Sequence, residues 1–161
     1  MSRESIVAAD RLAALERRLA EARILWAAVA AAQAGFIFWS SSRTWSGGPA
    51  GWPWFSNFMH FPLYGLLGGA AALALGLGTA RRPLARALAG IGLAVTFGAL
   101  DEWHQSFVPG RSADPMDVVT DLCGAGFAVL FLCYRLLPER RGLALGVGLA
   151  AAFTGAVLAS T

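Results

Sequence analysis

The fold of this chain is decided by an uncharged stretch of 22 residues at positions 58–79, FMHFPLYGLLGGAAALALGLGT. A helix needs about 20 mostly apolar residues to cross the hydrocarbon core of a bilayer. Four other stretches are of the same kind. The five together run from Ile24 to Ser40, Phe58 to Thr79, Leu84 to Leu100, Met116 to Tyr134 and Leu143 to Ser160. The sequence therefore predicts five transmembrane helices.

The overall composition points the same way. Of the 161 residues, 57% are hydrophobic and 14% are charged, and the mean hydropathy is +0.56. Soluble domains are about half apolar and a quarter charged, so an ordinary soluble enzyme and a disordered chain are both excluded. The two cysteines, Cys123 and Cys133, are too few for a disulfide framework. The predicted fold class is all-α, a polytopic integral membrane helix bundle.

The 13 basic residues are all arginines, and they gather at alternate connections between the stretches. Eleven of them lie before the first stretch, between the second and third, or between the fourth and fifth: Arg3, Arg11, Arg17, Arg18, Arg23, Arg81, Arg82, Arg86, Arg135, Arg140 and Arg141. Arg43 and Arg111 occupy the other two connections. Because basic residues accumulate in cytoplasmic loops, we expect a cytoplasmic N-terminus and an outside C-terminus. No nucleic-acid partner is expected, since the arginines flank the spans and form no stripe.

The N-terminal segment is charged, yet it has a helical pattern. Leu12, Leu15 and Leu19 recur at three- and four-residue spacing, and Asp10 could cap a helix that contains them. We therefore expect a cytosolic helical arm over residues 1–23 that continues into the first span, with the transmembrane domain over residues 24–161. A cleaved signal peptide is the alternative, and the acidic residues of this leader disfavour it.

Small residues are spread along the later stretches. Gly65 and Gly69 stand four residues apart, a spacing that permits close contact between helices. Two readings are open, tight packing within one bundle or dimerisation, and the first is the more common in a chain this rich in glycine. The oligomeric state is not predicted.

Polar residues that a membrane span rarely contains gather in two places. The segment from 101 to 121 contains Asp101, Glu102, Gln105, Arg111, Asp114, Asp117 and Asp121. His60 lies near the start of the second stretch, with Asn57 one turn before it and Tyr64 one turn after. Under the predicted topology both places lie at the outer face, so we expect them to converge in one outward-facing cavity between the second, third and fourth spans. Ionisable groups inside spans are costly and are usually functional or paired.

Some of these residues also have a structural explanation. Asp114 followed by Pro115 is typical of a helix start, with Asp114 as the cap. Asp121 lies beyond that start and needs a partner, either Arg111 or His60. Arg111 is expected to pair with at least one carboxylate, because an unpaired buried charge is expensive. Residues 107–110 predict a tight turn that brings Arg111 back toward the membrane.

The cluster could perform three kinds of work. It could hold Mg²⁺ or Ca²⁺, which take oxygen ligands, through Asp101, Glu102 and Asp117. It could perform acid–base chemistry on a lipid-linked substrate, with an anionic group of that substrate held by arginine. The catalytic residues would be His60, Asp101, Glu102, Asp117 and Asp121, and the substrate-binding residues would be Asn57, Tyr64, Gln105, Arg111 and Asp114. It could also be a closed ionic network that only stabilises the bundle.

Three segments carry a resemblance to a known family. They are NFMHFPLYGLLG at 57–68, DEWHQSFVPGRSADPMD at 101–117 and DLCG at 121–124. Together they resemble the VanZ-like family of bacterial membrane proteins, most strongly over residues 55–130. The family pattern leads us to expect a lysine near Asn57 and an asparagine at position 121. This chain has Asp121 instead, so one cation is lost and one anion is gained.

The family resemblance implies a place and a class of function. The family's namesake is associated with resistance to teicoplanin, a glycopeptide that acts on cell-wall precursors outside the membrane. The resemblance therefore implies a protein of the bacterial inner membrane that recognises or modifies an envelope lipid or a lipid-linked cell-wall precursor at the outer leaflet. Membrane lipids, such a precursor or a glycopeptide are the candidate partners. The alternative is a non-enzymatic membrane factor whose ionic cluster is structural.

Overall fold

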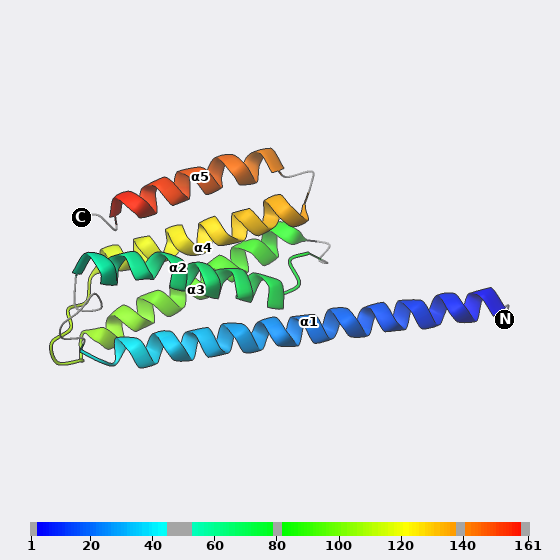
Figure 1. Cartoon of the computed structure of the whole chain (residues 1–161), viewed down its shortest axis with the longest axis horizontal. Coiled ribbons are helices and arrows are strands. Elements are labelled where there is room, and N and C mark those ends of the chain that lie inside the picture. Colours follow the sequence, from blue (N-terminus) through cyan, green and yellow to red (C-terminus); the bar gives the residue numbers. More distant parts are fainter. Residues whose placement is uncertain (1–2, 45–52, 79–81, 138–140, 159–161) are drawn as a thin grey trace.

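The computed structural model describes residues 3–44, 53–78, 82–137 and 141–158. Over these residues the chain is all-helical, which confirms the all-α part of the predicted class. The helices are α1 (Arg3–Ser41), α2 (Pro53–Ala74), α3 (Pro83–Gln105), α4 (Pro115–Leu136) and α5 (Arg141–Leu158). Figure 1 shows α2 to α5 side by side in an up-and-down bundle, with α1 along one side and extending past one end.

Three of the described helical segments are long and apolar enough to cross a membrane. They are Ala13–Ser41, Pro83–Gln105 and Pro115–Leu136. Around them the surface is rich in exposed apolar side chains, among them Leu88, Leu93 and Phe153. An apolar surface of this kind suits a lipid environment, where it makes no unfavourable contact with water.

Helix α1 continues without a break from the N-terminal segment into the first predicted span. Its 39 residues extend about 58 Å, against about 35 Å for α3. The predicted cap at Asp10 is wrong, because the helix already begins at Arg3 and no glycine or proline interrupts the intervening residues. At the point where the arm leaves the bundle, Arg23 Nε donates a hydrogen bond to the carbonyl oxygen of Ala74, at 3.0 Å.

Helix α2 is central, since it packs against α1, α3 and α4, while α5 packs against α4. Glycines allow this close approach. A Cβ at Gly68 would lie 2.8 Å from the Cβ of Ala125, so no larger residue fits between α2 and α4 there. Gly65 and Gly69 also face α4 within the same chain. In this structure the spaced glycines therefore serve packing inside the bundle. Cys123 and Cys133 are buried and free.

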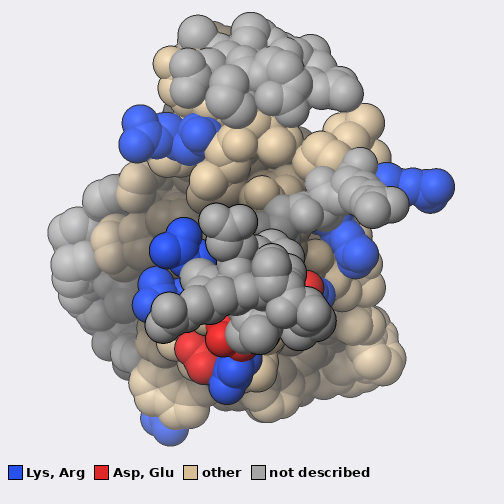
Figure 2. All heavy atoms as spheres, turned by 90° about the vertical axis from the view of Figure 1, so that its right-hand side faces the viewer, with Lys and Arg blue, Asp and Glu red and all other residues tan. Residues whose placement is uncertain are grey.

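The bundle has two ends that differ in their charge. We call one the arginine end, which contains Arg23, Arg82, Arg86 and Arg135 beside the arm. Figure 2 looks onto this end and shows arginine side chains distributed around it. We call the opposite end the polar end. It contains Ser41, His60, Asp101, Glu102, Gln105, Arg111, Asp114, Asp117 and Asp121.

Candidate functional site

The polar end is built where α1 and α3 finish and α2 and α4 begin. The connection from α3 to α4 contains the predicted tight turn, in which the Arg111 amide donates to the Val108 carbonyl at 3.1 Å and Gly110 has a φ of 79°. That positive φ favours glycine, and the turn directs Arg111 back toward the helices. Asp114 caps α4 as predicted, because its side chain accepts from the Met116 amide at 2.8 Å.

His60 and Asp121 form the centre of the site. The Nδ1 of His60 lies 2.9 Å from Oδ1 of Asp121, and the Nε2 of His60 lies 3.6 Å from Oδ2 of Asp117. Asp121 is completely buried. The ring of Tyr64 stacks on the imidazole, with 5.8 Å between the ring centroids. Of the two partners expected for Asp121, the structure selects His60.

Gly98 of α3 makes the room in which Asp121 lies. A Cβ at this position would overlap Oδ2 of Asp121 and would come within 3.2 Å of the Tyr64 ring. The buried Asp121 therefore depends on a missing side chain in a neighbouring helix. The other carboxylate oxygen of Asp121 accepts from His60, whereas Oδ2 has no hydrogen-bond partner among the described residues.

Asp101 and Glu102 are held by a network that links three elements. Ser41 Oγ donates to Asp101 Oδ1 at 2.6 Å. The side-chain amide of Gln105 donates to Asp101 at 3.1 Å and to Glu102 at 2.9 Å. The backbone amide of Asp114 donates to the second oxygen of Glu102 at 2.8 Å. These two anions at the unfavourable end of the α3 dipole are thus stabilised by hydrogen-bond donors from outside the helix backbone.

Arg111 does not pair with a carboxylate. Its Nε donates to Oε1 of Gln105 at 2.9 Å, and its Nη2 donates to the same oxygen. Among the described residues, the short contacts between a basic and an acidic side chain at the polar end are both made by His60, and they are ion pairs only when its ring is protonated. The expectation of an Arg111–carboxylate pair is therefore wrong. The reason is that Gln105 stands between the two charges, with its amide nitrogen toward the carboxylates and its oxygen toward the guanidinium.

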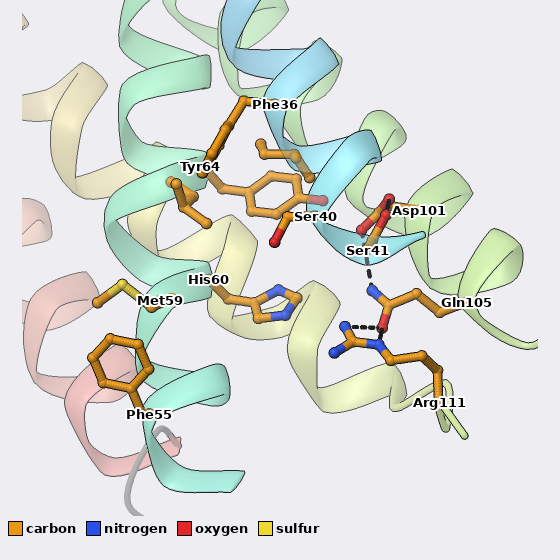
Figure 3. A pocket seen from close by; sticks show the side chains of 12 residues that line it. Phe36, Ser40, Ser41, Phe55, Met59, His60, Tyr64, Asp101, Gln105 and Arg111 are labelled. Carbon is orange, nitrogen blue, oxygen red and sulfur yellow. Dashed lines mark hydrogen bonds between the residues drawn. The ribbon is translucent and has the colours of Figure 1, made fainter. Parts of the chain in front are cut away.

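A cavity of about 330 Å³ opens beside this network, between α1, α2 and the end of α3. Its lining residues are Phe36, Ile37, Ser40, Ser41, Phe55, Met59, His60, Leu63, Tyr64, Asp101, Gln105 and Arg111. Figure 3 shows Phe55 and Met59 on one side and Asp101, Gln105 and Arg111 on the other. The cavity is thus divided into an apolar part and a polar part.

The expected site residues take three different positions. His60, Tyr64, Asp101, Gln105 and Arg111 line the cavity. Glu102, Asp117 and Asp121 also belong to the polar end but are not among its lining residues. Asn57 is half-buried one turn before His60, and the exposed Asp114 acts as a helix cap.

One group of these side chains has the spacing of a metal site. One potential ligand atom from each of His60, Glu102 and Asp117 lies within 4.8 Å of the others. This group differs from the expected set at one position, since His60 stands in the place given to Asp101. Asp101 is instead engaged by Ser41 and Gln105.

Sequence reasoning missed the contribution of α1. Ser40, Ser41 and Phe36 all line the cavity, and Ser41 is buried against Asp101. Nothing local marks these residues, because serines at the end of an apolar stretch are common. The available signal was topological, since the first span ends at the same face as His60.

Comparison with known proteins gives one match. A family model described as VanZ/LLP1 matches residues 14–138, which include both polar segments. No curated protein and no solved structure matches this chain.

Proposed function

The chain belongs to the VanZ/LLP1 family, and from this premise we propose that it recognises or modifies an anionic envelope lipid or a lipid-linked cell-wall precursor. The site of recognition is the cavity beside His60 and Arg111. The observation that carries the proposal is the division of this cavity into an apolar part and a polar part. A lipid whose chains are joined to a phosphate-bearing head group has the same division.

The proposal includes an orientation in the bacterial inner membrane. With all five helices crossing the bilayer, the arginine end faces the cytoplasm and the polar end faces the outer leaflet. The distribution of arginines supports this orientation, because eleven of the 13 belong to the connections on the side of the N-terminus. Envelope precursors are exposed at the outer leaflet, which is where this orientation puts the cavity.

Arg111 is the group that would hold the anion. It lines the cavity and donates to a neutral amide oxygen, so no ion pair within the described residues cancels its charge. A guanidinium presents several N–H donors in one plane and suits the oxygens of a phosphate. Phe36, Met59 and Leu63 line the same cavity and would contact the apolar chain.

His60 gives the site its capacity for proton transfer. Its ring lies between Asp117 and Asp121, and it also lines the cavity. A histidine held between carboxylates is a suitable general acid or base when a substrate lies within hydrogen-bond reach. Modification of the bound lipid, if it follows recognition, would use this residue.

The test is lipid binding by the full chain in nanodiscs. We expect saturable binding of a polyprenyl phosphate, weaker binding of the corresponding alcohol, and at least a tenfold loss in Arg111→Gln. Arg43→Gln is the matched control, because Arg43 lies over the exposed Trp39, at 4.5 Å from the ring centroid, and does not line the cavity. Equal affinity for phosphate and alcohol, or equal losses in both variants, would contradict the proposal.

A second function is favoured by the network itself. Consecutive hydrogen bonds join α1, α3 and the start of α4, and they are made by Ser41, Asp101, Gln105, Glu102 and the Asp114 amide. Such a network could serve only to stabilise a non-enzymatic membrane factor. Asp101→Asn separates the two functions: with ligand recognition it abolishes an envelope phenotype such as glycopeptide tolerance at normal protein abundance, whereas with a structural role the phenotype declines only together with folded protein.

A further inference from the structure

We propose that the polar end binds a divalent transition-metal ion through His60, Glu102 and Asp117. These residues come from α2, α3 and α4, and their ligand atoms lie within 4.8 Å of one another. His60 and Glu102 are buried and Asp117 is half-buried, so the three are withdrawn from bulk water. The ion would join three helices at one point.

The orientation of His60 is that of a metal ligand. Its Nδ1 lies 2.9 Å from Asp121, and because a carboxylate only accepts, Nδ1 carries a hydrogen; in the neutral form of the ring, Nε2 then has the lone pair that a metal ion would bind. A carboxylate behind one ring nitrogen, with the metal on the other, is the usual arrangement of metal-bound histidines. The Nε2 of His60 lies 3.6 Å from Oδ2 of Asp117. Two ligands of one tetrahedral ion, each at about 2.1 Å, are separated by about 3.4 Å, so only a small movement is needed.

The distribution of charge calls for a cation. Asp101, Glu102 and Asp121 are buried and Asp117 is half-buried, whereas the basic residues that line the cavity beside them are Arg111 and His60, and His60 is charged only when it is protonated. Buried carboxylates require compensating positive charge. A doubly charged ion at His60, Glu102 and Asp117 would supply that charge.

Two buried polar atoms beside His60 support the presence of a ligand. Tyr64 is 1% exposed and Asp121 is 0% exposed, and the Tyr64 hydroxyl and Oδ2 of Asp121 have no hydrogen-bond partner in the described structure. Unsatisfied buried polar atoms are rare in folded proteins. Tyr64 stacks on the His60 ring and lines the cavity, and in Figure 3 its hydroxyl points across that cavity toward Asp101 and Ser41. A group bound with the ion would find a hydrogen-bond partner there.

The ligand set selects the class of ion. One imidazole nitrogen with two carboxylates suits Zn²⁺ or Mn²⁺, whereas Ca²⁺ takes six to eight oxygen ligands and Mg²⁺ keeps most of its water. Three protein ligands leave at least one coordination position open. Because His60 also lines the cavity, that position would border the space assigned to the lipid head group. The metal site itself does not depend on that assignment.

The test uses the full chain in detergent, without a polyhistidine tag and freed of metal by a chelator. We expect one equivalent of Co²⁺ to bind, with weak visible absorption bands and no thiolate charge-transfer band, and Zn²⁺ to displace it. Thermal unfolding of the protein should shift upward when Zn²⁺ or Mn²⁺ is added, since a ligand of the folded state stabilises that state.

Variants locate the site. His60→Gln and Asp117→Asn should each weaken Zn²⁺ binding at least tenfold in calorimetry. His104→Gln is the matched histidine control, because His104 lies one turn from Asp101 but contacts Ser42 and Phe38. Asp10→Asn, on the exposed arm, is the carboxylate control. Both controls should stay within twofold of the unchanged protein.

Several outcomes would overturn the proposal: no saturable binding of Co²⁺, Zn²⁺ or Mn²⁺ by the unchanged protein, a thiolate band, or equal losses in His60→Gln and His104→Gln. Where His60→Gln fails to fold, Asp121→Asn replaces it, and it should weaken binding about 10- to 100-fold through the orientation of His60. These measurements contain no lipid. A chain that does not bind polyprenyl phosphate can therefore still show metal binding. A chain that does not bind metal can still be tested for lipid binding.

Discussion

The two ends of the bundle carry charge in opposite ways. At the arginine end, Arg82, Arg86 and Arg135 are exposed and have one sign, and Arg23 donates to a backbone carbonyl. At the polar end, Asp101 and Asp121 are buried, and each is bound by a side chain from another helix. Exposed charges can be changed at little cost, whereas a buried pair that loses one member costs about 3–5 kcal/mol. The difference fits the proposal above, in which the arginine end orients the chain and the polar end contains its site.

The largest expected effect is the all-or-none response of a topology reporter. A fusion after Gly47 should report the outside and a fusion after Pro138 the cytoplasm, because the connections rich in arginine stay inside. Both positions lie outside the described residues. A paired reporter, with alkaline phosphatase active outside and a fluorescent protein active inside, gives the measurement. The reversed pattern would put the polar end in the cytoplasm and remove the basis of the proposed function.

A methyl group added at the polar end should have an intermediate effect. Gly98→Ala inserts a Cβ that overlaps Asp121, so we expect a loss of about 1–3 kcal/mol in the free energy of unfolding. Gly92→Ala, in the same helix, meets no atom within 4 Å and should leave stability unchanged or slightly higher. Denaturant unfolding in detergent micelles compares the two. Similar stabilities for the two variants would mean that Asp121 moves aside at no cost. That result would contradict the close packing of Asp121 against Gly98.

The smallest effect concerns the start of α4. Asp114→Ala removes the side chain that accepts from the Met116 amide, and should lower stability by about 1 kcal/mol. Asp114→Asn keeps a capping oxygen and should lower stability by only a few tenths of a kcal/mol. The same unfolding measurement applies. If Asp114→Asn lowers stability as much as Asp114→Ala does, the negative charge of Asp114 contributes to stability beyond the capping hydrogen bond. The exposed edge of the polar end would then be as sensitive to loss of charge as its buried residues are.

Much of this architecture follows from local sequence signals. Apolar length predicts the helices, Asp114 followed by Pro115 predicts the start of α4, and Pro109 with Gly110 predicts the turn. The meeting of His60 with residues 101–121 also follows, because alternation of the helices brings both to one end. These features depend on signals within a few residues or on the order of the spans.

The partners inside the site could not be predicted in the same way. Arg111 was expected to bind a carboxylate, but Gln105 interposes its amide between the charges. The role of Ser41 depends on how far α1 extends, and the space for Asp121 depends on Gly98 in another helix. Each of these contacts joins residues from different helices, and their choice is a matter of tertiary packing that a single sequence does not display.

The amide of Gln105 has a consequence for selectivity. The side-chain nitrogen of Gln105 donates to Asp101 and Glu102. A 180° flip of this amide would turn its oxygen toward the two carboxylates, so the oxygen stays directed toward Arg111. A molecule that draws the guanidinium away leaves a carbonyl without its donor, at a cost of about 1–3 kcal/mol. For the proposed function, that cost would act as a threshold for binding. Neutral head groups, which bind a guanidinium no better than an amide oxygen does, would fail to displace Gln105, while a phosphate would exceed the threshold.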